Sequence, residues 1–238
     1  MKNYIFGIGV SNITEENALE LVLKRVKNGK KKCMIVTPNP EIVMYALSHP
    51  IYKRIINEAD LALCDGIGLF LAGSILGKPF RERITGVDFM DKLCAKASEN
   101  AVTVGFLGGR HGVAEKTAEC LRKKYPGLII KFSGEEWDVK TFPKEGVDIL
   151  FVAFGFPKQE EWIAKYLPML PIKVAMGVGG AFDYLSGRVK RAPFFIRSLG
   201  LEWLYRLIHQ PWRIKRQVVL PQFLYLVLKQ KMRIVKIN

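Results

Sequence analysis

Short apolar runs that alternate with helical patterns are the feature that most constrains this fold. The runs are four to six residues long and cover Tyr4–Ile8, Cys33–Val36, Leu61–Cys64, Val102–Leu107, Leu128–Phe132, Ile149–Phe154 and Val174–Val178. Several are apolar on both faces, as strands buried in a parallel sheet are. This alternation continues for about 185 residues and predicts an open, mostly parallel α/β sheet of Rossmann-like type, flanked by helices.

Helical patterns fill the intervals between these runs. Thr14 is expected to cap a helix that continues to about Asn28 and is closed by Gly29. The other predicted helical ranges are Glu41–Ala59 (one or two helices around Pro50), Asp88–Asn100, Gly112–Tyr125 and Lys158–Tyr166.

Basic charge is concentrated in the last fifth of the chain. The sequence has 37 Lys and Arg and 22 Asp and Glu, a net charge of +15. Residues 188–238 hold 12 of the basic residues and a single acid, Glu202, whereas residues 1–187 have a net charge of only +4. From Arg188 onward the pattern is helical, basic and aromatic. We therefore expect a Rossmann-like domain of residues 1–190 and a helical appendage of residues 191–238, which is built to meet a negative partner.

The appendage has a periodic polar stripe, at Ser198, Glu202, Arg206, His209, Arg213 and Arg216. Spacings of three and four residues predict a helix, which Pro211 could kink. Its wide apolar face, with Trp, Tyr and many Lys and Arg, is typical of a helix at the surface of an anionic membrane. A helix pair docked on the core and a single-stranded nucleic-acid site are the alternatives. The many large aliphatic side chains favour lipid, and we expect no nucleic-acid partner. An apolar face left uncovered in solution would favour a homo-oligomer.

The remaining composition indicates a protein that is soluble or lies on a membrane. The apolar stretches 61–77 and 218–228 are too broken or too short to span a bilayer. The N-terminus lacks the pattern of a signal peptide. The four cysteines are about 30 residues apart without a CxxC pair, which favours reduced thiols over a zinc site or disulfides.

In an open parallel sheet, ligands bind at the carboxyl ends of the strands. Gly or short polar groups follow six of the predicted strands, in the segments 37–40, 65–66, 108–111, 134–135, 155–159 and 179–183. Ordinary turns use the same residues, so one such segment is a weak signal. The six together favour a binding site at this edge.

Asp65 is the candidate catalytic residue. It ends a buried strand and precedes Gly66 in a tight turn, where a carboxylate can act as a general base, although capping the next helix is the simpler role. Arg81 and Arg83 are candidate phosphate clamps or plain surface charges. The glycine patterns do not complete the dinucleotide fingerprint, so NAD is disfavoured.

A nucleotide diphosphate remains consistent with the glycine turn that follows the Val102–Leu107 run. Glycines between a strand and a helix let backbone N–H groups approach a phosphate. The predicted nucleotide-binding residues all lie in such strand-end turns, and they are Gly108, Gly109, Arg110, Gly134, Glu135 and Asp183.

Six ordered motifs together resemble the WecG/TagA/CpsF family of glycosyltransferases. They are TPNPEIV, ADLALCDGIGL, ERITGVDFM, VGFLGG, DILFVAFGFPKQEEWI and GVGGAFDYLSGRVKRAP, followed by GLEWLYRL near the C-terminus. The likeness covers nearly the whole chain and is greatest to the TagA type. The interval around residues 134–147 is short for the family, which leaves its conformation open.

The resemblance implies an inverting transfer of N-acetylmannosamine from UDP-ManNAc to the 4-hydroxyl of GlcNAc on undecaprenyl diphosphate. This reaction builds the linkage unit of wall teichoic acid, needs no metal or other cofactor, and takes place on the inner face of the cell membrane. Asp65 would be the base, and Thr37, Asn39, Arg83 and Gln159 would line the pocket. Arg206, Arg213 and Arg216 would reach the phosphates.

Two alternatives remain open. The same family uses other donors, such as UDP-ManNAcA or UDP-glucose. Outside the enzyme class, a non-catalytic module that binds a nucleotide sugar or nucleic acid would share the glycine turns and the basic tail.

Overall fold

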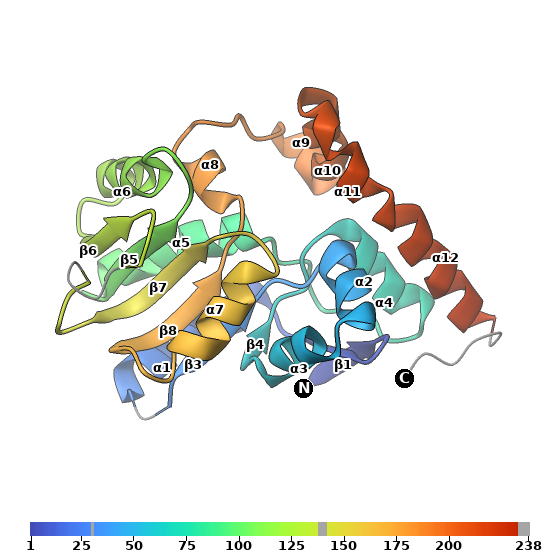
Figure 1. The fold of residues 1–238 in the computed structure, drawn as a ribbon, viewed down its shortest axis with the longest axis horizontal. Coiled ribbons are helices and arrows are strands. Elements are labelled where there is room, and N and C mark those ends of the chain that lie inside the picture. Colours follow the sequence, from blue (N-terminus) through green and yellow to red (C-terminus); the bar gives the residue numbers. More distant parts are fainter. Residues whose placement is uncertain (30, 138–141, 233–238) are drawn as a thin grey trace.

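The computed structural model describes residues 1–29, 31–137 and 142–232. Six parallel strands form the central sheet in the order β4-β3-β8-β7-β5-β6 (Figure 1). Their bounds are β3 Cys33–Val36, β4 Leu61–Ala62, β5 Thr103–Gly108, β6 Ile129–Gly134, β7 Val147–Ala153 and β8 Ile172–Gly177. The predicted open, parallel α/β sheet is confirmed, and its strand ends define one long edge.

The first predicted strand, Tyr4–Ile8, is wrong. Residues 2–11 form a separate antiparallel hairpin of β1 (Lys2–Ile5) and β2 (Ile8–Ser11). Phe6 and Gly7 make its turn with φ angles of 51° and 77°, a backbone conformation that Phe rarely adopts. The Phe6 side chain is buried. The apolar run of five residues therefore contains a turn that its pattern does not indicate, because Phe6 forms part of the turn and also places its side chain in the core.

Helices cover both faces of the sheet. The first face carries α1 (Glu15–Asn28), α5 (Gly86–Glu99), α6 (Val113–Lys124) and α8 (Ala181–Leu185). The second carries α2 (Pro40–Ser48), α3 (Pro50–Glu58), α4 (Ile67–Ile75) and α7 (Lys158–Tyr166). Alternate residues of a strand face opposite sides, so Ile35 joins the first cluster of buried side chains and Val36 the second. The two-sided apolar runs in the sequence follow from this arrangement.

Local signals set several helix ends. The Thr14 hydroxyl accepts a hydrogen bond from the Asn17 N–H at 3.4 Å, and Gly29 ends α1 with a φ of 58°. Pro50 begins α3 and separates it from α2. Helix α4 is absent from the predicted helices, because its two internal glycines weaken the helical pattern. Gly73 is needed there, since an added Cβ would lie 2.6 Å from the Phe80 ring.

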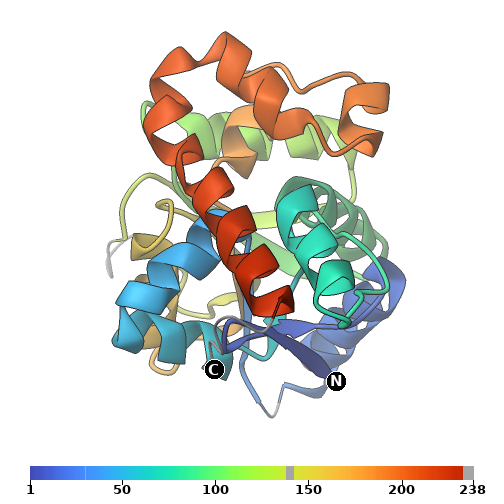
Figure 2. The same ribbon diagram turned by 90° about the vertical axis from the view of Figure 1, so that its right-hand side faces the viewer.

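The appendage folds back across the molecule. Its helices are α9 (Phe194–Ser198), α10 (Glu202–His209), a 3₁₀ turn (Pro211–Arg213), α11 (Ile214–Gln217) and α12 (Val219–Lys231). Figures 1 and 2 show α12 running alongside α2 and α4, with which it packs. Phe223 and Val227 of α12 are buried, and the Phe223 ring meets the Phe6 ring edge-on at 5.7 Å.

The polar stripe does not lie on one continuous helix: Ser198 belongs to α9, and a break occurs next to Pro211, where a kink was predicted. The chain leaves helical geometry at Gln210, where φ is −135°, and Pro211 starts a new turn. Pro221 is tolerated because it lies in the first turn of α12, where a backbone N–H has no partner in the helix.

Arg191 anchors the start of the appendage to the body. Its guanidinium donates two hydrogen bonds to Asp88, at 2.6 and 3.0 Å, and one to Glu202 at 3.2 Å. Burial alone would raise the pKa of Asp88, but hydrogen bonds from Arg191 and Thr85 outweigh it and lower that pKa to about 2. The carboxylate therefore stays charged at neutral pH and holds α5, α10 and the connecting segment together.

Two features bear on the environment of the chain. Within residues 1–29, 31–137 and 142–232, no helix is long and apolar enough to cross a bilayer. All four cysteines are free, and three of them, Cys33, Cys64 and Cys94, are buried. The prediction of reduced thiols agrees with this arrangement.

Candidate active site

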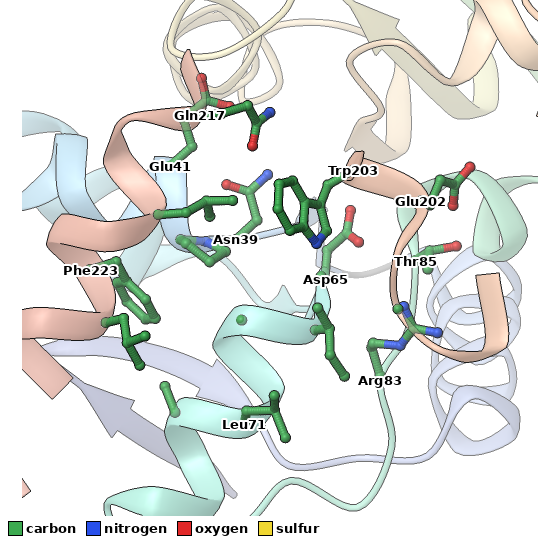
Figure 3. Close-up of a pocket in the computed structure, with 18 of the residues that line it drawn as sticks. Asn39, Glu41, Asp65, Leu71, Arg83, Thr85, Glu202, Trp203, Gln217 and Phe223 are labelled. Atoms are coloured by element: carbon green, nitrogen blue, oxygen red, sulfur yellow. The ribbon is translucent and has the colours of Figure 1, made fainter. Parts of the chain in front are cut away.

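A cleft of about 440 Å³ lies where the appendage passes over the ends of β3 and β4. Five segments line it: the loop after β3, the segment from Asp65 into α4, the loop before α5, Tyr184 of α8, and the appendage. Figure 3 shows Asp65 near its centre, with Trp203 and Glu202 of α10 and Phe223 of α12 around it. The tail thus covers the β3 and β4 part of the sheet edge that was predicted to bind ligands.

Asp65 lies three residues beyond β4, in the turn that leads into α4. Its backbone N–H donates to the Pro38 carbonyl at 3.1 Å, which joins the turns after β3 and β4. Its Oδ2 accepts a long hydrogen bond of 3.4 Å from the Gly86 N–H at the start of α5. Gly86 permits this approach, because an added Cβ would lie 3.3 Å from the Thr37 side chain. The Asp65 carboxylate is left facing the cleft (Figure 3).

Burial raises the pKa of Asp65 to about 6. The negative charge of Glu202 also raises this pKa, whereas the hydrogen bonds from Gly86 and Gly66 and the positive charge of Arg83 lower it. A base of this pKa is mostly ionised at pH 7 and still basic enough to accept a proton. The rate of any reaction that uses Asp65 as base should therefore rise about tenfold per pH unit below pH 6 and level off above it. A pH–rate profile measures this, and a profile that is flat between pH 5 and 7 would contradict it.

The other predicted pocket residues on the β3 and α5 sides divide into two groups. Asn39 and Arg83 line the cleft, and both also serve the fold. The Asn39 side chain caps α2 by accepting from the Ile42 N–H at 3.0 Å, and Arg83 donates to the Arg197 carbonyl at 2.7 Å. Thr37 is buried beside Gly86 and does not line the cleft, so its contact with substrate remains a prediction. Arg81 is exposed and does not line the cleft.

The appendage contributes two of its three predicted arginines to the cleft. The Arg206 guanidinium lies 4.9 Å above the Tyr184 ring, and its Nε is buried without a hydrogen-bond partner among the described residues. Arg216 lines the rim, where it makes hydrogen bonds of 2.5 and 2.9 Å to Glu41. The side chain of Arg213 lies outside the described part. Arg206 is thus a half-buried cation whose buried Nε has no hydrogen-bond partner among the described residues, whereas the charge of Arg216 is balanced by Glu41.

Gln159 lies beneath the strand-end turns rather than in the cleft wall. Its Oε1 accepts from the Gly155 N–H at 3.1 Å and the Gly179 N–H at 2.9 Å, and its Nε2 donates to Glu160 at 2.7 Å. Glu160 is fully buried, and burial raises its pKa to about 7. Gln159 therefore ties the turn after β7 to the turn after β8, and a direct contact with substrate remains a prediction.

Replacing Gln159 by Leu should lower the free energy of unfolding by about 2–4 kcal/mol, because two partly buried backbone N–H groups lose their acceptor. Urea unfolding followed by circular dichroism measures the change. Glu161→Leu, an exposed position on the same helix, is the matched control and should change stability by less than about 0.5 kcal/mol. Equal effects of the two variants would show that the amide has no such role.

The predicted nucleotide-binding residues gather on the other half of the sheet edge, away from the cleft lining. Gly108 and Gly109 have φ angles of 103° and 75°, and an added Cβ on Gly108 would lie 2.9 Å from the Ala153 backbone. Glu135 accepts from the Gly112 N–H at 2.5 Å, so its carboxylate occupies the start of α6. The Arg110 carbonyl accepts from Arg188, Gly134 ends β6, and Asp183 lies in the first turn of α8. Their contact with a nucleotide remains a prediction, and residues 138–141 of the neighbouring loop lie outside the described part.

The sequence analysis missed several lining residues. Glu41, Tyr184 and Trp203 line the cleft; each lies within one of the quoted motifs, but none was named as a candidate site residue. Glu202 was noted as a polar position of the tail, but its approach to Asp65 follows from the path of the chain. Each of these residues reaches the cleft through tertiary packing.

The sequence that builds this fold and cleft matches a known class of protein over nearly its whole length. The Glycosyl transferase WecG/TagA/CpsF family matches residues 3–236, so the chain belongs to this family of glycosyltransferases. It is 38% identical over 207 residues to the N-acetylglucosaminyldiphosphoundecaprenol N-acetyl-beta-D-mannosaminyltransferase of Bacillus spizizenii, covering 84% of this chain and 80% of the relative. It is 36% identical to the protein of the same name from Staphylococcus aureus, covering 98% of this chain and 94% of the relative. The resemblance inferred from the motifs is confirmed.

Within the described residues, no three His, Cys, Asp or Glu side chains form a group that could hold a metal ion. The prediction that the reaction needs no metal remains to be tested.

Proposed function

We propose that this chain transfers N-acetylmannosamine from UDP-ManNAc to the 4-hydroxyl of GlcNAc on undecaprenyl diphosphate, with inversion and without a metal ion. The reaction would supply the linkage unit of wall teichoic acid. The observation that carries the proposal is that one cleft is lined by Asp65, with its raised pKa, and by Arg206, whose Nε has no hydrogen-bond partner among the described residues. The names of the relatives state the transferred sugar and the acceptor.

The proposed chemistry is a single displacement. The Asp65 carboxylate removes the proton from the acceptor hydroxyl, whose oxygen forms a bond to the anomeric carbon as the bond to the UDP oxygen breaks. UDP leaves with an additional negative charge on its terminal phosphate. A cation next to that oxygen stabilises the transition state, and Arg206 and Arg83 both line the cleft where they could do so. Attack opposite the leaving group inverts the configuration at the anomeric carbon.

The appendage, proposed as residues 191–238, would have two tasks. Through Arg206 and Arg216 it completes the cleft wall, and through its basic end it would bind an anionic membrane surface. Lys229 and Lys231 lie at the end of α12, whereas Arg233 and Lys236 fall outside the described residues. Exposed apolar side chains of α9–α11, among them Phe194, Ile208 and Trp212, would enter the lipid interface. The protein would thus work peripherally on the inner face of the cell membrane.

A donor panel tests the proposal directly. Purified full-length protein is given UDP-ManNAc, UDP-ManNAcA, UDP-glucose or UDP-GlcNAc with a GlcNAc-diphosphate-lipid acceptor, with and without EDTA. Product with UDP-ManNAc that EDTA does not reduce is the expected result. Preference for another donor would move the chain to a different reaction of the same family. Binding of UDP without any product would favour a non-catalytic module.

A further inference from the structure

The lining of the cleft is polar in one part and apolar in the other. Around Asp65 it is polar and holds Arg83, Arg206 and Glu202. Beyond Gly68 it continues between α4 and α12, where its walls are Leu71 and Ile75 on one side and Leu220 and Leu224 on the other. Figure 3 shows Leu71 and Phe223 on the side of the cleft away from Glu202 and Gln217.

The apolar half is open rather than filled. Leu71 is 50% exposed and Leu224 is 51% exposed, although both line the cleft. Beneath them, Ala72, Phe223 and Val227 are buried and form an apolar floor. Large aliphatic side chains that border a concave surface without covering each other are suited to an apolar ligand.

Charge is absent from these walls. Neither α4 (Ile67–Ile75) nor the first nine residues of α12, 219–227, contain Lys, Arg, Asp or Glu. Charged side chains return on α12 at Lys229, beyond the cleft lining. Nine residues of helix give α4 a length of about 13 Å, so the apolar half is a groove and not a single contact.

We propose that this groove, bordered by Leu71 and Leu224, binds the part of the acceptor's isoprenoid chain that adjoins the diphosphate. The inference rests on the proposed function, since it assigns one end of the same substrate. The order of groups in such an acceptor is sugar, diphosphate and hydrocarbon. The same cleft has the Asp65 carboxylate in its polar part and the apolar walls of α4 and α12 beyond Gly68, so the sugar hydroxyl can lie at Asp65 while the hydrocarbon lies in the groove.

Binding of diphosphate probes tests the groove without catalysis and without a membrane. Farnesyl diphosphate and inorganic diphosphate are titrated into the full-length protein by calorimetry, below the concentration at which the farnesyl probe forms micelles. Farnesyl diphosphate should bind at least about tenfold more tightly, because its hydrocarbon leaves water in the groove. Equal affinities for the two probes would overturn the proposal.

Three variants identify the surface responsible. Leu71→Gln and Leu224→Gln should each remove most of the preference for the farnesyl probe while leaving the affinity for inorganic diphosphate unchanged. Leu228→Gln is the matched control, because Leu228 lies one turn beyond Leu224, is 45% exposed and does not line the cleft. It should keep the preference. Loss of the preference in all three variants would indicate a general apolar surface and would contradict the groove. Leu71 and Leu224 are half-exposed, and unchanged circular dichroism melts confirm that the variants fold.

Chain-length dependence separates this inference from the proposed function. Acceptors that carry GlcNAc diphosphate on chains of one, three and five isoprene units are compared without detergent. In the parent protein the KM should fall with length, and in the Leu71→Gln and Leu224→Gln variants it should not. Transfer that is independent of chain length would overturn the groove and leave the proposed function intact. A farnesyl preference without transfer from any donor would support the groove and contradict the proposed function.

Discussion

Replacing Asp65 by Asn is expected to lower the rate of sugar transfer by about 10²–10⁴-fold, since the amide cannot accept the proton of the acceptor hydroxyl. Binding of UDP should change little, because the predicted nucleotide-binding residues, such as Gly108 and Gly109, lie on the other half of the sheet edge and do not line the cleft around Asp65. Single-turnover assays with UDP-ManNAc measure the rate, and titration with UDP measures the affinity. Unchanged turnover would eliminate Asp65 as the base.

The same substitution should stabilise the protein. The pKa of Asp65 is raised, so the folded state binds a proton more tightly than the unfolded state, and stability falls as pH rises from about 4 to about 6. At pH 7 the ionised carboxylate lowers the free energy of unfolding by up to about 3 kcal/mol. The neutral amide should restore about 1–3 kcal/mol of this free energy, and a higher melting temperature would show it.

Asp60→Asn is the matched control for this substitution. Asp60 precedes β4 at the opposite end of the same strand, where it accepts from the Met34 N–H at 3.1 Å and pairs with Lys31. Its replacement should lower stability and leave transfer unchanged. A variant of Asp65 that is inactive because it melts early would contradict the assignment, since the prediction joins loss of activity to gain of stability.

Removal of the appendage after residue 190 should abolish transfer while the body still folds. Arg206, Arg216, Trp203 and the whole α12 wall of the cleft would be lost. Loss of the arginines alone is expected to cost about 10²-fold or more in rate, because the departing diphosphate loses its nearest cations. The central sheet and the helices on its two faces lie entirely before residue 190, so a cooperative thermal transition should remain.

A second truncation, after Gly200, sharpens this experiment. It retains the ion pair of Arg191 with Asp88 and the hydrogen bond from Arg83 to the Arg197 carbonyl. It should therefore be more stable than the shorter chain and equally inactive. Both chains expose the surface that Phe223 covers over Phe6, so self-association on sedimentation is expected. A truncated body as active as the full chain would show that the appendage takes no part in the reaction.

The fold was largely predictable because its signals are local and repeated. Two-sided apolar runs located the parallel strands, and Thr14, Gly29 and Pro50 marked helix ends through their own backbone preferences. Errors arose where a local rule was overruled. Phe6 adopts a positive φ because it packs against Phe223, more than 200 positions away, and α4 forms despite its glycines because Gly73 fits against Phe80.

The sequence by itself determined the class of sheet, the edge at which ligands should bind, and Asp65 as the residue to test, since each depends on neighbours along the chain. The tertiary structure decided which groups meet Asp65. Arg206 enters the cleft and Arg216 is balanced by Glu41 because the tail turns at Gln210 and α12 docks on α2 and α4. The apolar groove beside them also has one wall from α4 and one from α12. No sequence pattern predicts that α4 and α12 lie side by side, because about 150 residues separate them along the chain and only tertiary packing brings them together.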